Sequence, residues 1–182
     1  FVMELPNYRF PSAKSVVLLM WEKAKDFLTR AFTVIFMATV IIWFMQTFDT
    51  RLNVVENSAD SILAALGRLV SPIFAPLGFG DWRMVTALVS GFTAKEAVVS
   101  TFGVILGVST EQLGIALHSL FTTASAASFL AFCLLYTPCV AAVSTIKTEL
   151  KSGWKTVGIV FAQCLVAWLA AFVVYHVGLL LT

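Results

Sequence analysis

Four long apolar runs constrain what this chain can fold into. They cover residues 31–48, 84–108, 124–146 and 157–181, and only the second contains Lys, Arg, Asp or Glu. A helix of about 20 apolar residues crosses the hydrocarbon core of a bilayer. Charged residues make up 12% of the 182 residues, against about 25% in a soluble domain, and the mean hydropathy is +0.92. We therefore predict an all-α protein, a polytopic bundle of transmembrane helices in a lipid bilayer.

The third run is interrupted by Pro138. Proline lacks a backbone N–H and its ring clashes with the preceding turn, so a helix kinks or breaks there. Backbone groups freed at such a break cannot face lipid and need protein, water or an ion. Cys139 follows directly, and hydroxyls of Tyr136, Thr137 and Ser144 are close in sequence. One interpretation is a transporter binding site on a broken helix; the other is a proline kink beside a small apolar cysteine.

Two adjacent charges, Lys95 and Glu96, lie near the middle of the second run, shortly after Gly91. Each costs about 2.5–3.5 kcal/mol at the centre of a transmembrane helix. Adjacent helical residues point in different directions, so at least one charge needs a partner in the bundle or a water-filled cavity. The pair either forms a buried structural ion network or belongs to an ion path, in which Glu96 can ligate a divalent cation and Lys95 tunes the charge.

Residues 61–80 are apolar but contain Arg68, Pro72, Pro76, Gly78 and Gly80. An uninterrupted lipid-facing helix does not fit this composition. We predict a broken or re-entrant element, with Arg68 facing protein or water. Paired interrupted segments are typical of transporter binding sites.

The distribution of Lys and Arg between the segments that flank the apolar runs predicts the topology, because short cytoplasmic loops are enriched in these residues. Residues 1–28 and 147–155 are basic, which places them in the cytoplasm, and the stretches 49–60 and 109–123 then lie outside. Within 1–28 we expect an extended arm over 1–11 and an amphipathic interfacial helix that begins after Ser12. Residues 29–182 form the transmembrane domain. Residues 109–123 read as an outer loop that can hold a short helix capped by Ser109 or Thr110.

The sequence lacks the signature motifs of several functions. The chain contains no GxxxxGK[ST], HExxH or GxSxG motif, so we expect no enzyme activity from it. A net charge of +2 gives no reason to expect nucleic acid as a partner. His118 and His176 are weak candidates for metal ligands. Cys133 and Cys164 lie in apolar runs and are interpreted as small apolar packing residues.

Four segments jointly resemble the ferrous iron transport protein B family. They read FVMELP followed by Tyr8, PLGFGDWR at 76–83, GFTAKEAVV at 91–99 and LLYTPCVA at 134–141. The last resembles the core of the family's second gate motif. The resemblance implies that the chain is the C-terminal part of the transmembrane gate domain of a longer protein. A G domain and a first gate region would then lie upstream.

The resemblance implies part of the membrane pore of a GTP-dependent ferrous iron importer in the bacterial inner membrane. Fe²⁺ is the expected substrate, with GTP and Mg²⁺ acting only through the upstream G domain. Small cytoplasmic accessory proteins and further copies of the chain are possible partners. The expected ion path comprises Cys139, Glu96, Tyr136 and Thr137. Pro138, Lys95, Gly91 and Ser144 are expected to shape it.

Two alternatives stay open at this point. The chain can be a gate-type carrier of nucleosides or another organic solute, or a structural membrane protein of the spore type. It can also carry a different divalent metal such as Mn²⁺ or Zn²⁺, since a thiol suits soft and borderline metals.

Overall fold

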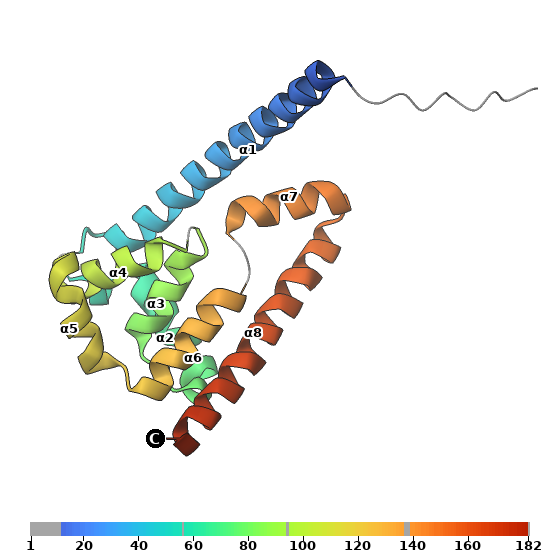
Figure 1. Cartoon of the computed structure of the whole chain (residues 1–182). Helices are drawn as coiled ribbons and strands as arrows, with labels where there is room; N and C mark the ends of the chain where they lie inside the picture. Colours follow the sequence, from blue (N-terminus) through green and yellow to red (C-terminus); the bar gives the residue numbers. More distant parts are fainter. Residues whose placement is uncertain (1–11, 56, 94, 137–138, 182) are drawn as a thin grey trace, which may run out of the picture.

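The computed structural model describes residues 12–55, 57–93, 95–136 and 139–181. This part of the chain is helical, with one isolated bridge between Phe48 and Val54. The α-helices are α1 (Ala13–Thr47), α2 (Ile62–Phe74), α3 (Trp82–Gly91), α4 (Ala97–Leu106), α5 (Thr110–Leu120), α6 (Thr123–Leu135), α7 (Val140–Leu150) and α8 (Gly153–Leu181). Two short 3₁₀ helices, η1 (Ser58–Asp60) and η2 (Ala75–Leu77), flank α2. The all-α bundle predicted from the apolar runs is confirmed (Figure 1).

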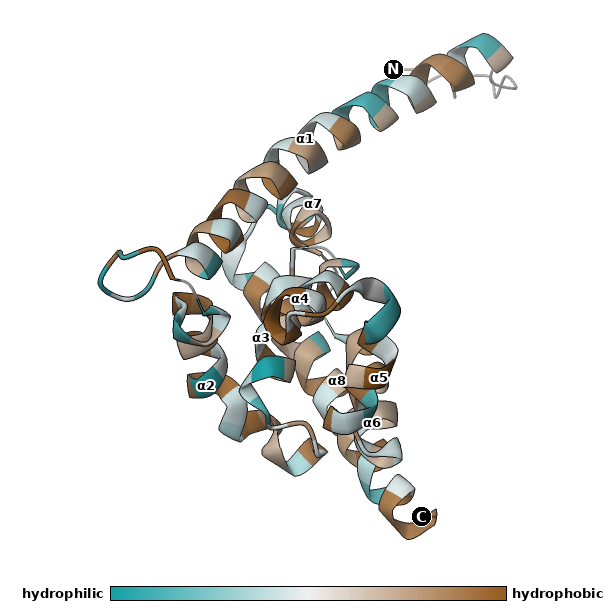
Figure 2. Cartoon of the chain, turned by 90° about the vertical axis from the view of Figure 1, so that its left-hand side faces the viewer, coloured by the Kyte–Doolittle hydropathy of each residue, from teal (hydrophilic) through white to brown (hydrophobic). Residues whose placement is uncertain are grey.

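Helix α1 differs from its prediction. It is one continuous helix of 35 residues rather than a surface helix over 12–28 followed by a separate span over 31–48. No Gly or Pro interrupts it, and at 1.5 Å per residue it is about 52 Å long, more than the thickness of a bilayer core. Its N-cap is Ser12, as predicted, with the hydroxyl accepting from the Ser15 N–H. Hydrophilic residues gather toward its N-terminal end (Figure 2). The arm expected over 1–11 lies outside the described residues.

The break predicted within residues 61–80 is confirmed. The segment Ile62–Leu77 and helix α3 meet at an angle of 103°. Pro72 lies inside α2 and Pro76 inside η2. Gly78 then turns the chain with φ +81°, and Asp81 caps α3 by accepting from the Arg83 N–H. The Arg68 guanidinium lies over the ring of Trp82, 5.2 Å from its centroid.

The run over 84–108 is not one helix. Helix α3 ends at Gly91 and α4 begins at Ala97, so Lys95 and Glu96 lie in a break and not inside a continuous span. This break removes two charges from a helix centre. Downstream, α4 and the segment Glu111–Leu120 are bent by 80°. The stretch expected as an outer loop is therefore mostly helix α5, with Ser109 as its N-cap and Glu111 in its first turn.

The C-terminal part contains the second predicted break. Helix α6 starts with a capping box between Thr122 and Ser125 and ends at Leu135, and α7 starts at Val140. Residues 147–155 were expected to be a loop, but they form the end of α7 and the start of α8. Lys151 makes the turn between them with φ 49°.

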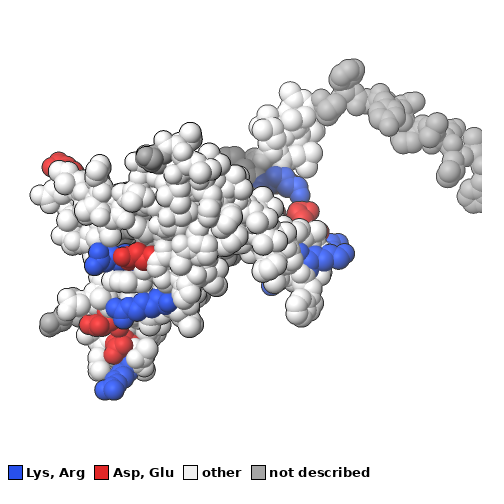
Figure 3. Space-filling model, turned by 90° about the horizontal axis from the view of Figure 1, so that it is seen from below, with Lys and Arg blue, Asp and Glu red and all other residues white. Residues whose placement is uncertain are grey.

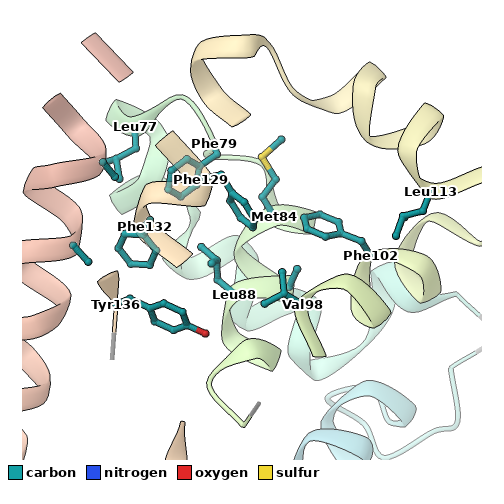
Figure 4. Close-up of a cluster of buried hydrophobic side chains, with 13 residues drawn as sticks. Leu77, Phe79, Met84, Leu88, Val98, Phe102, Leu113, Phe129, Phe132 and Tyr136 are labelled. Carbon is teal, nitrogen blue, oxygen red and sulfur yellow. The ribbon is translucent and has the colours of Figure 1, made fainter. Parts of the chain in front are cut away.

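Helix α6 packs along α8, and both enclose the core. The Ser128 hydroxyl donates to the Ala171 carbonyl at 2.9 Å, with both residues fully buried. Phe79, from the bend before α3, packs edge-to-face on Phe129 at 5.4 Å. Figure 4 shows this aromatic cluster, with Tyr136 at one end of it. The buried cluster comprises Leu77, Phe79, Met84, Ala87, Leu88, Val98, Phe102, Leu113, Phe129, Phe132, Tyr136, Ala167 and Ala171.

The described helices are suited to a membrane. Three segments are long and apolar enough to cross a bilayer, Ala13–Thr47, Thr123–Leu150 and Gly153–Leu181. The number rises to five if each bent pair forms one span. Charged side chains occur as small separate groups on an otherwise uncharged face (Figure 3). The protein is therefore a multi-pass helical membrane protein.

Candidate functional site

The two helix breaks lie against each other. The Val140 N–H, at the start of α7, donates to the Phe92 carbonyl at 3.1 Å. The Lys95 ammonium donates to the Leu134 carbonyl at 3.2 Å. One break thus satisfies backbone and side-chain groups of the other, which is the condition for irregular backbone in a membrane. We call residues 92–96 together with residues 136–139 the paired breaks.

Tyr136 is the buried centre of the paired breaks. It is 7% exposed, its ring stacks on Phe132 at 5.5 Å, and the Lys95 Nζ lies 5.3 Å from its ring centroid. Its hydroxyl is buried and has no hydrogen-bond partner among the described residues. In Figure 4 the hydroxyl points away from α8, toward the side of Val98. A polar atom in this state marks a place for a polar ligand.

Gly91 permits this close approach. A Cβ on Gly91 would collide with Val98 Cγ2 and would lie 2.8 Å from the Tyr136 hydroxyl oxygen. The preceding residue, Ser90, is 1% exposed, and its hydroxyl also has no hydrogen-bond partner in the part of the chain that the structure describes. Sequence reasoning assigned no role to Ser90. Its only signal was a hydroxyl just before a glycine in an apolar run.

Cys139 lies at the N-cap of α7 and is partly buried. Its carbonyl accepts from the Ala142 N–H at 2.9 Å and the Val143 N–H at 3.1 Å, while its thiol makes no capping bond. Thr137 and Pro138 lie outside the described residues.

Glu96 is the exposed N-cap residue of α4. Within the described residues, no group of three or more His, Cys, Asp or Glu side chains is arranged to hold a metal ion. The structure therefore joins the backbones that carry Glu96 and Cys139 without assembling a closed ligand set from their side chains. Ser144 lies elsewhere, beside a smaller hollow of about 420 Å³ that Lys147 and Lys151 also line.

A cavity of about 890 Å³ reaches the paired breaks. Lys95, Cys133 and Tyr136 line one part of it, and its walls are mostly apolar side chains of α4, α5, α6 and α8. His118 lines it from α5. His176 does not line it; its Nδ1 lies 2.9 Å from the Phe172 carbonyl oxygen.

These features define the class: a polytopic helical membrane protein in which two broken helices meet beside a cavity. The chain belongs to the Gate family, whose model, described as "Nucleoside recognition", matches residues 28–153. A second model, described as "Ferrous iron transport protein B C terminus", matches residues 1–23.

Curated relatives extend this similarity to nearly the whole chain. Fe(2+) transporter FeoB of Staphylococcus aureus (strain COL) is 40% identical over 180 residues, which cover 98% of this chain and 27% of the relative. Fe(2+) transporter FeoB of Methanocaldococcus jannaschii is 33% identical over 187 residues, covering 99% of this chain and 28% of the relative. A Porphyromonas gingivalis relative, named as a fusion of Fe(2+) transport protein A and Fe(2+) transporter FeoB, is 31% identical over 229 residues, covering 99% of this chain and 27% of the relative.

The resemblance to the ferrous iron transport protein B family is thereby confirmed. The chain spans 27% of the length of the Staphylococcus aureus relative. No solved structure matches it.

Proposed function

We propose that this chain forms part of the membrane pore of a ferrous iron importer and that Fe²⁺ passes at the paired breaks. The observation that carries the proposal is the 3.1 Å hydrogen bond from Val140 to Phe92, which joins the break before Cys139 to the break that holds Glu96. The names of the relatives, Fe(2+) transporter FeoB, supply the substrate.

The donor chemistry fits a borderline cation. Cys139 offers a thiol and Glu96 a carboxylate, and carbonyl and hydroxyl oxygens of the breaks, including Tyr136 and Thr137, complete the set. Sulfur favours Fe²⁺, Zn²⁺ and similar ions over Mg²⁺ and Ca²⁺. A set that assembles only when the ion arrives binds weakly, and weak binding lets the ion leave the pore.

The proposed topology follows from the positive-inside rule. Residues 1–28 and 147–155 face the cytoplasm, and residues 49–60 and 109–123 face the outside of the bacterial inner membrane. The chain catalyses no reaction itself. GTP and Mg²⁺ act through an upstream G domain. A small accessory protein is a partner, in keeping with the fusion named in Porphyromonas gingivalis.

A nucleoside carrier is the second candidate. The Gate family is described by nucleoside recognition, and a cavity of about 890 Å³ has room for an organic solute. Its largely apolar wall also fits a base better than it fits a metal ion.

Uptake by the full-length protein in proteoliposomes decides between them. We expect uptake of ⁵⁵Fe²⁺ under reducing conditions and none of labelled uridine or adenosine. Cys139→Ser and Glu96→Ala should each lower iron uptake roughly tenfold, the smaller end of the loss seen when a metal site is disturbed. Cys164→Ser is the matched cysteine control and should transport normally. Uptake of nucleoside but not of iron would replace the proposal, and normal iron uptake by both site variants would overturn the site.

A further inference from the structure

The C-terminal end of α6 presents a carbonyl that its own helix cannot satisfy. In a continuing helix the Leu134 carbonyl would accept from the N–H of the residue four positions on. That residue is Pro138, which has no N–H. The Lys95 ammonium donates to this carbonyl instead, at 3.2 Å across the paired breaks.

Two further features make this position attractive to any cation. The Lys95 Nζ lies 5.3 Å from the centroid of the Tyr136 ring, within the range of a cation–π contact. It also lies at the carbonyl end of a 13-residue helix, where the helix dipole is negative.

Within the described residues, the ammonium is held by dipoles and not by an opposite charge. The residues that line the adjoining cavity include Lys95 but no Asp or Glu. A carbonyl oxygen and an aromatic face are groups that also bind free cations in channels and aromatic cages. The ammonium therefore occupies a position that would also suit a free cation, and no carboxylate among the cavity-lining residues neutralises its charge.

We propose that the Lys95 ammonium is a tethered substitute for the transported cation: it occupies a cation position made by the Leu134 carbonyl and the Tyr136 ring, and Fe²⁺ displaces it. This inference rests on the proposed function, because it names the competitor at the same site. Lys95 and an incoming divalent ion repel each other strongly at short distance in a medium of low dielectric constant. The flexible lysine stem can swing into the cavity that Lys95 lines.

Tethering gives the pore a way to release its ion. When Fe²⁺ leaves the paired breaks, the ammonium returns and satisfies the Leu134 carbonyl. Neither state then leaves this carbonyl unpaired, which would cost free energy at membrane depth, where water is absent. A purely structural lysine would satisfy the same carbonyl but would not respond to iron.

Fe²⁺ affinity of the purified full-length protein tests the competition. Under anaerobic conditions we expect Lys95→Met, which keeps the stem and removes the charge, to bind Fe²⁺ at least about tenfold more tightly than the native protein. Lys95→Arg retains the charge and should stay near the native affinity, as should Lys25→Met on the exposed face of α1. An unchanged or weaker affinity in Lys95→Met would contradict the proposal.

Amine labelling of the native protein tests displacement without any substitution. Saturating Fe²⁺ should increase labelling of Lys95 several-fold and leave labelling of Lys25 unchanged. Equal labelling of Lys95 with and without bound Fe²⁺ would show that the ion does not displace it.

Methylammonium separates this inference from the proposed function. Because it resembles the lysine head group, it should raise the Tm of Lys95→Met progressively as its concentration rises and leave the Tm of Lys25→Met unchanged. Stabilisation of Lys95→Met in a protein that neither binds nor transports Fe²⁺ would retain the cation position and reject the iron proposal. The opposite result would be normal iron uptake by the native protein, with no tighter Fe²⁺ binding by Lys95→Met, no displacement of Lys95 by Fe²⁺ and no stabilisation by methylammonium. That result would retain the iron proposal and reject the cation position.

Discussion

Val140 and Phe92 share a backbone hydrogen bond of 3.1 Å, although 48 positions separate them in the sequence. Each residue lies at the edge of a helix break, Phe92 just after α3 and Val140 at the start of α7. The bond fixes the register of one break on the other. Side chains that share no helix, Lys95 and Tyr136, are thereby brought together.

The approach of the two breaks depends on the absence of a side chain at residue 91. We predict that Gly91→Ala destabilises the protein by about 1–3 kcal/mol, the usual cost of overpacking, because its Cβ would collide with Val98 and crowd the Tyr136 hydroxyl. Iron uptake should fall with it. Gly158→Ala on α8 is the matched control, since nothing lies within 4 Å of its Cβ. Thermal unfolding of both variants in detergent makes the comparison, and equal Tm values would contradict the close contact.

Gly78, in the bend before α3, has a positive φ and also packs against a side chain. Gly107 has only the positive φ, so a comparison of the two glycines separates these effects. Gly78 and Gly107 both have positive φ, +81° and +64°, so alanine at either costs about 1 kcal/mol or more in backbone strain. Only at Gly78 does the added Cβ also run into a side chain, the ring of Tyr175 on α8. Gly78→Ala should therefore lower the Tm clearly more than Gly107→Ala. Similar shifts would show that the bend does not pack on α8 as described.

The buried hydrogen bond between α6 and α8 is worth little despite its depth. Ser128→Ala should cost only about 0.6 kcal/mol, the average for side-chain hydrogen bonds between membrane helices, because the Ala171 carbonyl lies inside α8 and alanine fits the same space. Ser119→Ala, on a hydroxyl that donates to the nearby Ala116 carbonyl, should be neutral. A loss of several kcal/mol in a Ser128→Ala unfolding measurement would mean that Ser128 has a larger structural role.

Features governed by local backbone chemistry were predictable from the sequence. Helix α6 ends at Leu135 and α7 begins at Val140, on either side of the sequence position of Pro138, and Pro76 lies in η2 directly after α2; both agree with the missing N–H of proline. Ser12 caps α1 because its hydroxyl accepts from a first-turn N–H. Features that depend on competing tertiary contacts were not. The break between α3 and α4 has no proline, and only packing against α7 and Tyr136 shows why the chain leaves its helix near Lys95.

The sequence also did not show that α1 is one continuous helix. Its charges indicated a surface helix, but an amphipathic stretch and an apolar stretch without Gly or Pro between them can continue as one helix. For the site, the sequence named Tyr136, Lys95 and Gly91, which the structure brings together. It could not show the unpartnered Ser90 hydroxyl, because burial of a single serine has no periodic signal.

Protection of the Cys139 thiol by iron is the most direct measure of whether Fe²⁺ passes the paired breaks. A thiol reagent is applied to the full-length protein without oxygen, and labelling of each cysteine is followed by mass spectrometry with and without Fe²⁺. We predict that Fe²⁺ slows labelling of Cys139 severalfold, leaves Cys164 unchanged, and protects Cys139 much less in Glu96→Ala. Labelling of Cys139 at the same rate with and without Fe²⁺, in a protein that takes up iron, would place the ion path elsewhere.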